Sequence, residues 1–424
     1  MVTCEKIVLS NGLRVLLVPK SDSLATTMLV LVEAGSKYET KNLNGLSHFL
    51  EHMCFKGTKR RPRPIDITNE LNNIGAVYNA FTGQEYTGYY AKARNSDLDI
   101  VLDVLADMYV NPVFDEQEIE KEKGVIIEEI NLRQEDMPQG KVQILFSKLL
   151  YGDQPAGWPV GGEKEFIRNM TRADFIKYRA EHYLAGATTI VIAGGFDGQE
   201  LAQKIERSFG GIMTGIKKDK EKTREAQTEP AVVLGKKETD QSHLVLGVRA
   251  YNLFDERRFA LELLAEILGG GMGTRLFERL RTDMGVAYYI DADAETATDH
   301  GVLAASAGVD SKRLKDVVAA ILDEFGKLKH MPVPEDELQR VKNRVTAGLV
   351  LGLETSNSLA MFYGGEEILE KSIMSPEELT RRFEAVTAEE IRAVANDIFK
   401  NDKLNLAVVG PSDDPQPLRD ILVI

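Results

Sequence analysis

The feature that most constrains the fold is an internal repeat. The segment "TMLVLVEAG" from Thr27 resembles the later segment "SHLVLGVRA" from Ser242. We call their separation in sequence, 242 − 27 = 215 residues, the repeat offset. The helical patterns "SDLDIVLDVLADM" from Ser96 and "SKRLKDVVAAILDEF" from Ser311 have the same offset, and each begins at a serine suited to N-capping. Between these blocks, "GAVYNAFT" and "GVAYYIDA" match as strands. The repeat predicts two copies of one α/β unit.

Length and one polar stretch set the expected domain boundaries. A chain of 424 residues is long enough for two domains with separate cores. The stretch "TGIKKDKEKTREAQTEP" is charge-dense and poor in large apolar side chains, which is typical of a linker. We therefore predict an α+β fold with an N-terminal domain over 1–213, a linker over 214–230 and a homologous C-terminal domain over 231–424. Each domain is expected to be a largely antiparallel sheet packed with helices.

Composition argues against several classes of function. The formal net charge of −14 disfavours binding to nucleic acid or to anionic lipid. The two cysteines, Cys4 and Cys54, provide no disulfide framework, and reduced thiols favour a cytoplasmic location. The N-terminal residues predict a hairpin turning at Asn11 and Gly12 rather than a signal peptide. No apolar run reaches the roughly 18 residues that suggest a membrane span.

The strongest chemical signal is "HFLEH", residues 48 to 52. His48 and His52 are one helical turn apart, so both can reach one metal ion from the same face. Zinc in a catalytic site needs a further protein ligand and an open position for water, and a nearby carboxylate can take the proton of that water. Glu51 is the obvious general base. The order His-x-x-Glu-His is the inverzincin pattern.

The third ligand must come from elsewhere, and "EKEKGVIIEEINLR" offers candidates. Glu122 and Glu129 are seven residues apart and share a helical face. The adjacent Glu128 competes with Glu129, because both can occupy nearby faces. Taken alone, glutamates in such a segment are more typical of a solvated helix surface.

His48, Glu51 and His52, followed by Glu129 in "EKGVIIEE", resemble the pitrilysin or insulinase family of zinc peptidases, in the branch near the mitochondrial processing peptidase. The resemblance implies that His48, His52 and Glu129 bind one Zn²⁺ per chain, with Glu122 as a partner behind the site. It selects Glu129 over Glu128. It also implies a zinc endopeptidase that hydrolyses short or unfolded peptides.

The segment "GAVYNAFTGQEYTGYY", residues 75 to 90, resembles the strand that flanks the cleft in this family. The resemblance implies that this strand pairs with an extended peptide. Asn79 would then bond the peptide backbone, Ala80 would belong to the pairing edge, and Phe81 would line a side-chain pocket. From the residues alone, core packing explains Phe81 equally well.

The second copy lacks the zinc motif, because a shift by the repeat offset places Leu263, Glu266 and Ile267 at its three positions. It offers instead "GGGMGTRLFERLRTDMGVAYYI", residues 269 to 290. By the family resemblance, Arg281 and Tyr288 contact the substrate near the scissile bond and stabilise its developing oxyanion. Without the resemblance, Arg279 and Tyr289 compete for these roles, and surface salt bridges are the more usual reading.

The glycine run from Gly269 to Gly271 lacks the Gly-Lys-Ser/Thr ending of a phosphate loop, so a turn or helix end is expected.

The resemblance also implies a partner. Long family members fuse two such halves into a clamshell, so this chain is expected to form a homodimer in which the partner's C-terminal domain completes the active site. Two alternatives are a non-catalytic scaffold or peptide-binding subunit of a heteromeric processing peptidase, and an obligate heterodimer. Because every motif residue is present on one chain, an active homodimer is the simpler interpretation. The sequence does not identify the physiological peptide.

Overall fold

The structure, a computed structural model, describes residues 4–424 and divides into two compact units. Unit 1 consists of the residues up to Ile130, Pro159–Glu221 and Leu351–Ile373. Unit 2 consists of Asn131–Trp158, Lys222–Val350 and Met374–Ile424. This division differs from the single boundary expected from the linker, because each unit includes one segment from the other half of the chain.

Unit 1 is built on a six-stranded sheet with the order β1-β2-β6-β3-β5-β4. Its strands are β1 (Glu5–Val8), β2 (Arg14–Pro19), β3 (Ala25–Val32), β4 (Val77–Thr82), β5 (Thr87–Arg94) and β6 (Thr188–Gly194). Among these described strands only the β2–β6 pair is parallel, and the other pairs are antiparallel. The predicted hairpin joins β1 to β2, and Gly12 in its turn has a φ of 89°, a conformation that favours glycine.

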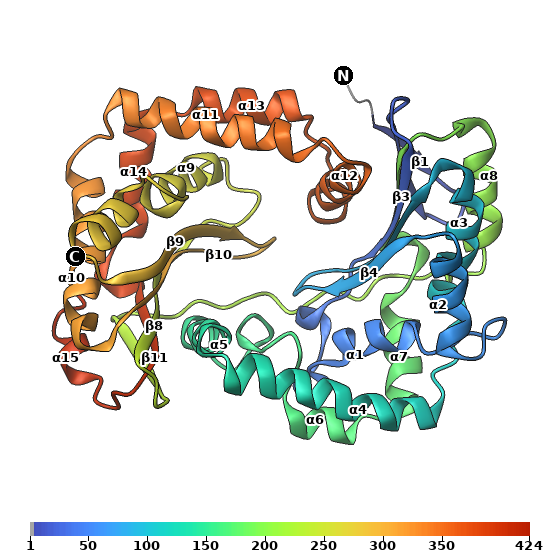
Figure 1. Cartoon of the computed structure of the whole chain (residues 1–424), viewed down its shortest axis with the longest axis horizontal. Coiled ribbons are helices and arrows are strands. Elements are labelled where there is room, and N and C mark those ends of the chain that lie inside the picture. Colours follow the sequence, from blue (N-terminus) through green and yellow to red (C-terminus); the bar gives the residue numbers. More distant parts are fainter. Residues whose placement is uncertain (1–3) are drawn as a thin grey trace. The chain divides into compact units, whose positions relative to one another are not determined.

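Helices cover both faces of this sheet (Figure 1). They are α1 (Leu46–Cys54), α2 (Pro64–Asn73), α3 (Leu98–Val110), α4 (Glu116–Ile130), α6 (Lys164–Asn169), α7 (Arg172–His182), α8 (Gly198–Phe209) and α12 (Ser356–Glu370). Because side chains alternate along a strand, Val15 and Leu17 of β2 join the core beneath α1 and α3, whereas Leu16 and Val18 pack against α12. A segment from the C-terminal half of the sequence thus covers the second face of the unit 1 sheet.

Unit 2 is built on a five-stranded sheet with the order β7-β11-β8-β10-β9. Its strands are β7 (Ala231–Lys236), β8 (Gln241–Ala250), β9 (Ala287–Thr296), β10 (Gly301–Asp310) and β11 (Leu404–Gly410). Its helices are α5 (Pro138–Tyr151), α9 (Arg258–Gly269), α10 (Leu314–His330), α11 (Glu335–Gly352), α13 (Pro376–Ala385), α14 (Ala388–Ile398) and α15 (Gln416–Arg419). The unit also contains two π-helical turns, Asn131–Asp136 and Phe277–Asp283.

The second face of the unit 2 sheet is covered by α5, which comes from the N-terminal half of the sequence. Val142, Phe146 and Leu150 of α5 pack against Val245 and Val409 of the sheet. The apolar stripe of α5 therefore explains why residues 131–158 belong to unit 2 although they precede the predicted boundary.

The two sheets share their order and pairing directions once β1 is set aside. The parallel pair β2–β6 corresponds to β7–β11, and the remaining strands follow antiparallel in both sheets. Two mixed, largely antiparallel sheets packed with helices agree with the predicted fold class. The expected N-caps do not form, because Ser96 and Ser311 lie inside short 3₁₀ turns that precede α3 and α10.

The predicted linker lies in a segment for which the described residues show neither helix nor strand, between the end of α8 and the start of β7. The division between the two units also falls in this segment, after Glu221. Within unit 1, the Lys217 ammonium group pairs with the Glu33 carboxylate at 2.5 Å. The first part of the predicted linker is therefore attached to unit 1.

Candidate metal centre

Helix α1 carries the His-x-x-Glu-His motif, and a carboxylate from a preceding turn holds its first turn. Leu46, Phe49 and Leu50 are fully buried, so the apolar side of α1 is fixed in the core. At the start of the helix, Glu39 accepts hydrogen bonds from the backbone N–H groups of Gly45, at 2.8 Å, and Ser47, at 2.6 Å. An acceptor is needed here because the first N–H groups of a helix have no partner within it.

The opposite side of α1 presents the two histidines to Glu129 of α4. The Glu129 Oε2 atom lies 3.6 Å from His48 Nε2 and 3.9 Å from His52 Nε2. Glu129 is half-buried, whereas the neighbouring Glu128 points to solvent. In the part of the chain that the structure describes, these three residues form the one group of three potential ligands whose donor atoms all lie within 4.8 Å of one another.

The donor set fits zinc. Zinc binds histidine nitrogens and carboxylate oxygens at about 2.0–2.1 Å in tetrahedral geometry, which separates neighbouring donor atoms by about 3.4 Å. The two separations given above are slightly longer, so small side-chain movements would bring all three atoms to bonding distance. Two histidines and one glutamate also leave the fourth position for water, as in catalytic rather than structural zinc sites.

Glu122, two helical turns before Glu129 on α4, orients His52. The His52 Nδ1 atom lies 2.9 Å from Glu122 Oε1, and the Lys56 ammonium group pairs with the other carboxylate oxygen. Burial acts to raise the pKa of Glu122, but the hydrogen bonds from His52 and Lys56 outweigh it and lower the pKa below its usual value. The ionised carboxylate accepts the proton on Nδ1, which leaves Nε2 of His52 available as a metal ligand.

Glu51 is buried, and a residue of the unit 1 sheet fixes its side chain. Its Oε2 atom accepts a hydrogen bond from the hydroxyl group of Thr82, the last residue of β4. The side chain is only 9% exposed. Glu51 thus lies between the two histidines in the sequence of α1, with one carboxylate oxygen fixed by a hydroxyl group.

The predicted peptide-binding residues lie on β4, which is the last strand in the order of the unit 1 sheet. Asn79 is exposed, and its side-chain oxygen accepts a hydrogen bond from the N–H of Ala80 at 2.9 Å. The ring of Phe81 lies across Gly88 and meets Tyr86 edge to face, with ring centroids 5.9 Å apart. Phe81 therefore packs against its own sheet.

The predicted substrate contacts of unit 2 are adjacent to each other. Arg281 lies in the π-helical turn Phe277–Asp283, and its guanidinium group donates to the backbone oxygen of Tyr288 at the start of β9. Tyr288 is 61% exposed. The structure thus links the pair through the main chain and leaves the phenol group of Tyr288 accessible in this unit.

Sequence reasoning missed three residues around the motif: Glu39, Lys56 and Thr82. Glu39 and Thr82 reach α1 only through the fold, so no local spacing could reveal them. Lys56 lies just past the end of α1, four residues after His52, and could have been noticed as a cation close to the motif in sequence.

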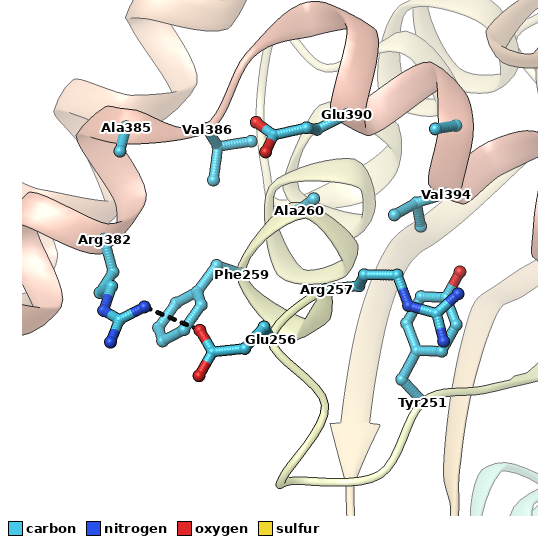
Figure 2. Close-up of a pocket in the computed structure, with 11 residues that line it drawn as sticks. Tyr251, Glu256, Arg257, Phe259, Ala260, Arg382, Ala385, Val386, Glu390 and Val394 are labelled. Atoms are coloured by element: carbon cyan, nitrogen blue, oxygen red, sulfur yellow. Dashed lines mark hydrogen bonds and ion pairs between the residues drawn. The ribbon is translucent and has the colours of Figure 1, made fainter.

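The pocket of about 400 Å³ in unit 2 is a different kind of site (Figure 2). It lies between α9, α13 and α14, and its apolar wall includes Phe259 and Val394. Both arginines at this pocket are already paired: Arg257 stacks 3.8 Å above the Tyr251 ring, and Arg382 bonds Glu256 at 2.7 Å. The described residues that line it include no histidine or cysteine, so they offer no ligand set like that of unit 1.

Comparison with known proteins identifies the family. Residues 14–162 match the model described as insulinase (Peptidase family M16), and residues 169–345 match the Peptidase M16 inactive domain. A Bacillus subtilis protein named as an uncharacterized zinc protease is 34% identical and covers 97% of this chain and 98% of its own. A Streptomyces coelicolor protein with the same description is 31% identical, over 98% of this chain and 92% of its own.

Solved structures share the fold. A protease from Helicobacter pylori has a TM-score of 0.89 at 23% identity and covers 97% of this chain and 100% of its own. A Pseudomonas fluorescens structure described as a peptidase M16 inactive domain has the same TM-score at 18% identity, over 97% of this chain and 98% of its own. No helix among the described residues is long and apolar enough to cross a membrane. On its sequence matches, this chain belongs to the insulinase family of zinc peptidases, peptidase family M16.

Proposed function

We propose that this chain is a zinc-dependent endopeptidase that hydrolyses short or unfolded peptides. The observation that carries the proposal is the arrangement on α1 and α4: three donor atoms gathered for one metal ion, with Glu51 buried beside them and Glu122 hydrogen-bonded to a ligand. Structural zinc sites use four protein ligands, so a three-ligand set with an adjacent carboxylate favours hydrolysis.

The residues divide the chemistry among them. A bound zinc ion would lower the pKa of a water molecule and polarise the peptide carbonyl group. Glu51 takes a proton from the attacking water and passes it to the leaving amine. Thr82 keeps the Glu51 carboxylate in place, and Glu122 keeps His52 in the tautomer that can bind metal.

The peptide is proposed to bind as an added strand along β4. Among the described strands β4 hydrogen-bonds to β5 on one side only, which leaves its other edge for an extended chain. Asn79 and Ala80 would contact the peptide backbone there, and Phe81 would form the base of a side-chain pocket. Arg281 and Tyr288 are proposed to donate hydrogen bonds to the scissile carbonyl oxygen as negative charge develops on it.

Zinc analysis combined with a cleavage assay tests this function. We expect about one zinc per chain. We also expect cleavage of a quenched fluorescent peptide library that a chelator abolishes and added zinc restores. Bound zinc without cleavage would favour a scaffold subunit or a missing partner. Absence of zinc from protein purified with excess metal would rule out the proposed ligand set.

We further propose that two chains associate and that Arg281 and Tyr288 act on the zinc site of the other subunit. The shared strand order of the two sheets supports an origin by duplication, and the relatives given above have about the same length as this chain. A mixture of an Arg281→Ala protein with a Glu51→Gln protein tests the sharing of sites. Mixed dimers should regain part of the wild-type activity, and no recovery after demonstrated subunit exchange would contradict it. A cytoplasmic location is part of this proposal.

A further inference from the structure

Unit 2 contains an ion pair at the positions that match Glu51 and Glu129 of unit 1. Glu266 on α9 follows Glu51 by the repeat offset, and Arg344 on α11 follows Glu129 by the same offset. The Nε atom of Arg344 is 3.5 Å from Oε2 of Glu266. Arg344 therefore occupies the position that matches Glu129, and its guanidinium group lies next to the Glu266 carboxylate.

The pair lies against the glycine run, which begins at the last residue of α9. A Cβ atom added to Gly270 would overlap with the Oε2 atom of Glu266. Gly271 has a φ of +142°, and a Cβ atom added there would be 2.6 Å from a guanidinium nitrogen of Arg344. A side chain at position 270 or 271 would therefore displace the end of one of the two charged side chains, and the φ of Gly271 by itself favours glycine.

The glycine run leads into the segment that carries Arg281. The hydroxyl group of Thr274 donates to the backbone oxygen of Gly271 at 2.7 Å. The N–H of Glu278, in the π-helical turn with Arg281, donates to the backbone oxygen of Thr274 at 2.9 Å. A continuous path of contacts thus runs from the ion pair to the Arg281 segment.

The Glu266 carboxylate is partly buried and lies within reach of the Arg344 charge. The Oε2 atom of Glu266 is screened from solvent, and burial raises the pKa of its carboxyl group, whereas the Arg344 charge acts to lower it. The side chains of Glu266 and Arg344 are 30% and 48% exposed, so water screens the pair in part and its contribution is modest. Arg344 supplies the cation from a helix that is distant in sequence.

We propose that Glu266 and Arg344 are positioning residues for peptide binding: their ion pair fixes the glycine run 269–271 and thereby holds Arg281 and Tyr288 in place. This inference rests on the proposed function for its catalytic consequence, but the anchoring itself is a property of unit 2 alone. The positions that carry Glu51 and Glu129 at the proposed metal site of unit 1 would serve in unit 2 to fix a loop.

Hydrogen exchange measured by mass spectrometry tests the anchoring in the full-length chain. Arg344→Ala should increase the exchange rate of residues 269–284 by about fivefold, and the milder Glu266→Gln should do the same to a smaller degree. Arg340→Ala is the matched control, since Arg340 lies one turn earlier on α11 and pairs with Asp336 in an exposed position. Exchange in β8 and β11 should not change in any variant.

Activity then separates positioning from general destabilisation. Arg344→Ala should raise KM for a peptide about fivefold with a smaller effect on kcat, zinc content should stay at the wild-type value, and Arg344→Lys should recover most of the loss. Unchanged exchange in both Arg344→Ala and Glu266→Gln would overturn the proposal. If the wild type does not cleave peptides, the proposed function fails, while the exchange data still decide whether the pair anchors the loop.

Discussion

Units 1 and 2 share a strand order, but matched helical positions carry polar side chains at the candidate metal centre in unit 1 and core residues in unit 2. In unit 1 the α1 positions 48 and 52 hold histidines that reach Glu129, with side chains 14% and 17% exposed. In unit 2 the corresponding α9 positions hold Leu263 and Ile267, which are at most 1% exposed and belong to the core. Helices at matched places beside the two sheets therefore carry proposed metal ligands in one unit and core residues in the other, because function depends on the site rather than on the fold.

The largest difference between the units should appear at the matched glutamates, Glu51 and Glu266. Glu51→Gln keeps the size of the side chain but removes the base, so kcat should fall by about 10²–10⁴-fold. Glu266→Gln should lower kcat/KM by only about fivefold or less, because this residue acts through a loop. Steady-state peptide cleavage with zinc content as the control measures both. Equal losses would mean that the two glutamates do not differ in role as proposed.

The second difference concerns metal and stability at matched positions of α1 and α9. His48→Ala should abolish zinc binding at stoichiometric metal and with it the cleavage activity, since two ligands hold zinc poorly. Leu263→Ala should leave zinc content unchanged but lower the free energy of unfolding by about 2–5 kcal/mol, because it opens a cavity in the core. Elemental analysis and denaturant titration distinguish the outcomes. Zinc loss in Leu263→Ala without unfolding would contradict the division of roles.

A smaller difference is expected at Glu122 and Glu337, which are also separated by the repeat offset. Glu122→Gln weakens the hydrogen bond that orients His52, so zinc affinity should fall about 10–100-fold. Glu337 bonds Arg275 with both oxygens at 2.8 Å, and Glu337→Gln should leave zinc affinity unchanged. Competition with a chromogenic chelator gives both affinities. A normal affinity in Glu122→Gln would remove it from the support of the site.

The smallest expected effect is a pH response that belongs to unit 1. Burial lowers the pKa of His182 to about 4, so the folded state keeps this imidazole neutral while the unfolded chain binds a proton below about pH 6.5. Stability is therefore lost as the pH falls. Between pH 7 and pH 5 the loss should be about 1–2 kcal/mol, and His182→Phe should reduce this slope.

The pH dependence is best followed by hydrogen exchange in α7 and β6, with β8 and β11 of unit 2 as the internal reference. An unaltered slope in a folded His182→Phe protein would assign the acid sensitivity to other groups.

Sequence periodicity was sufficient to predict the repeated strands and helices, because β3 and β8 are apolar runs and α3 and α10 have apolar residues at helical spacing. The His-x-x-Glu-His spacing likewise indicated a shared face, since one helical turn is a local property. The placement of α5 and α12 could not be predicted. Their apolar residues indicate a buried face, but helical spacing does not say which sheet that face covers.

The same limit applies to the surroundings of the metal centre. Glu39 reaches the start of α1 from a preceding turn, and Thr82 reaches Glu51 from β4, so neither contact follows from a spacing rule. The choice of Glu129 over Glu128 needed the family resemblance at first. In the structure it corresponds to a difference in exposure between the two side chains.

Each sheet is covered on one face by a helix from the other half of the sequence, α12 on unit 1 and α5 on unit 2, and this arrangement has a consequence for biosynthesis. A ribosome releases the strands of the unit 1 sheet long before residues 356–370, so Leu16, Val18 and Leu29 stay uncovered until nearly the whole chain has emerged. The apolar face of α5 likewise stays uncovered until the last strand of its sheet, β11, has been synthesised. Neither half can complete its core alone, and fragments cut at the linker should aggregate when made separately but assemble when expressed together.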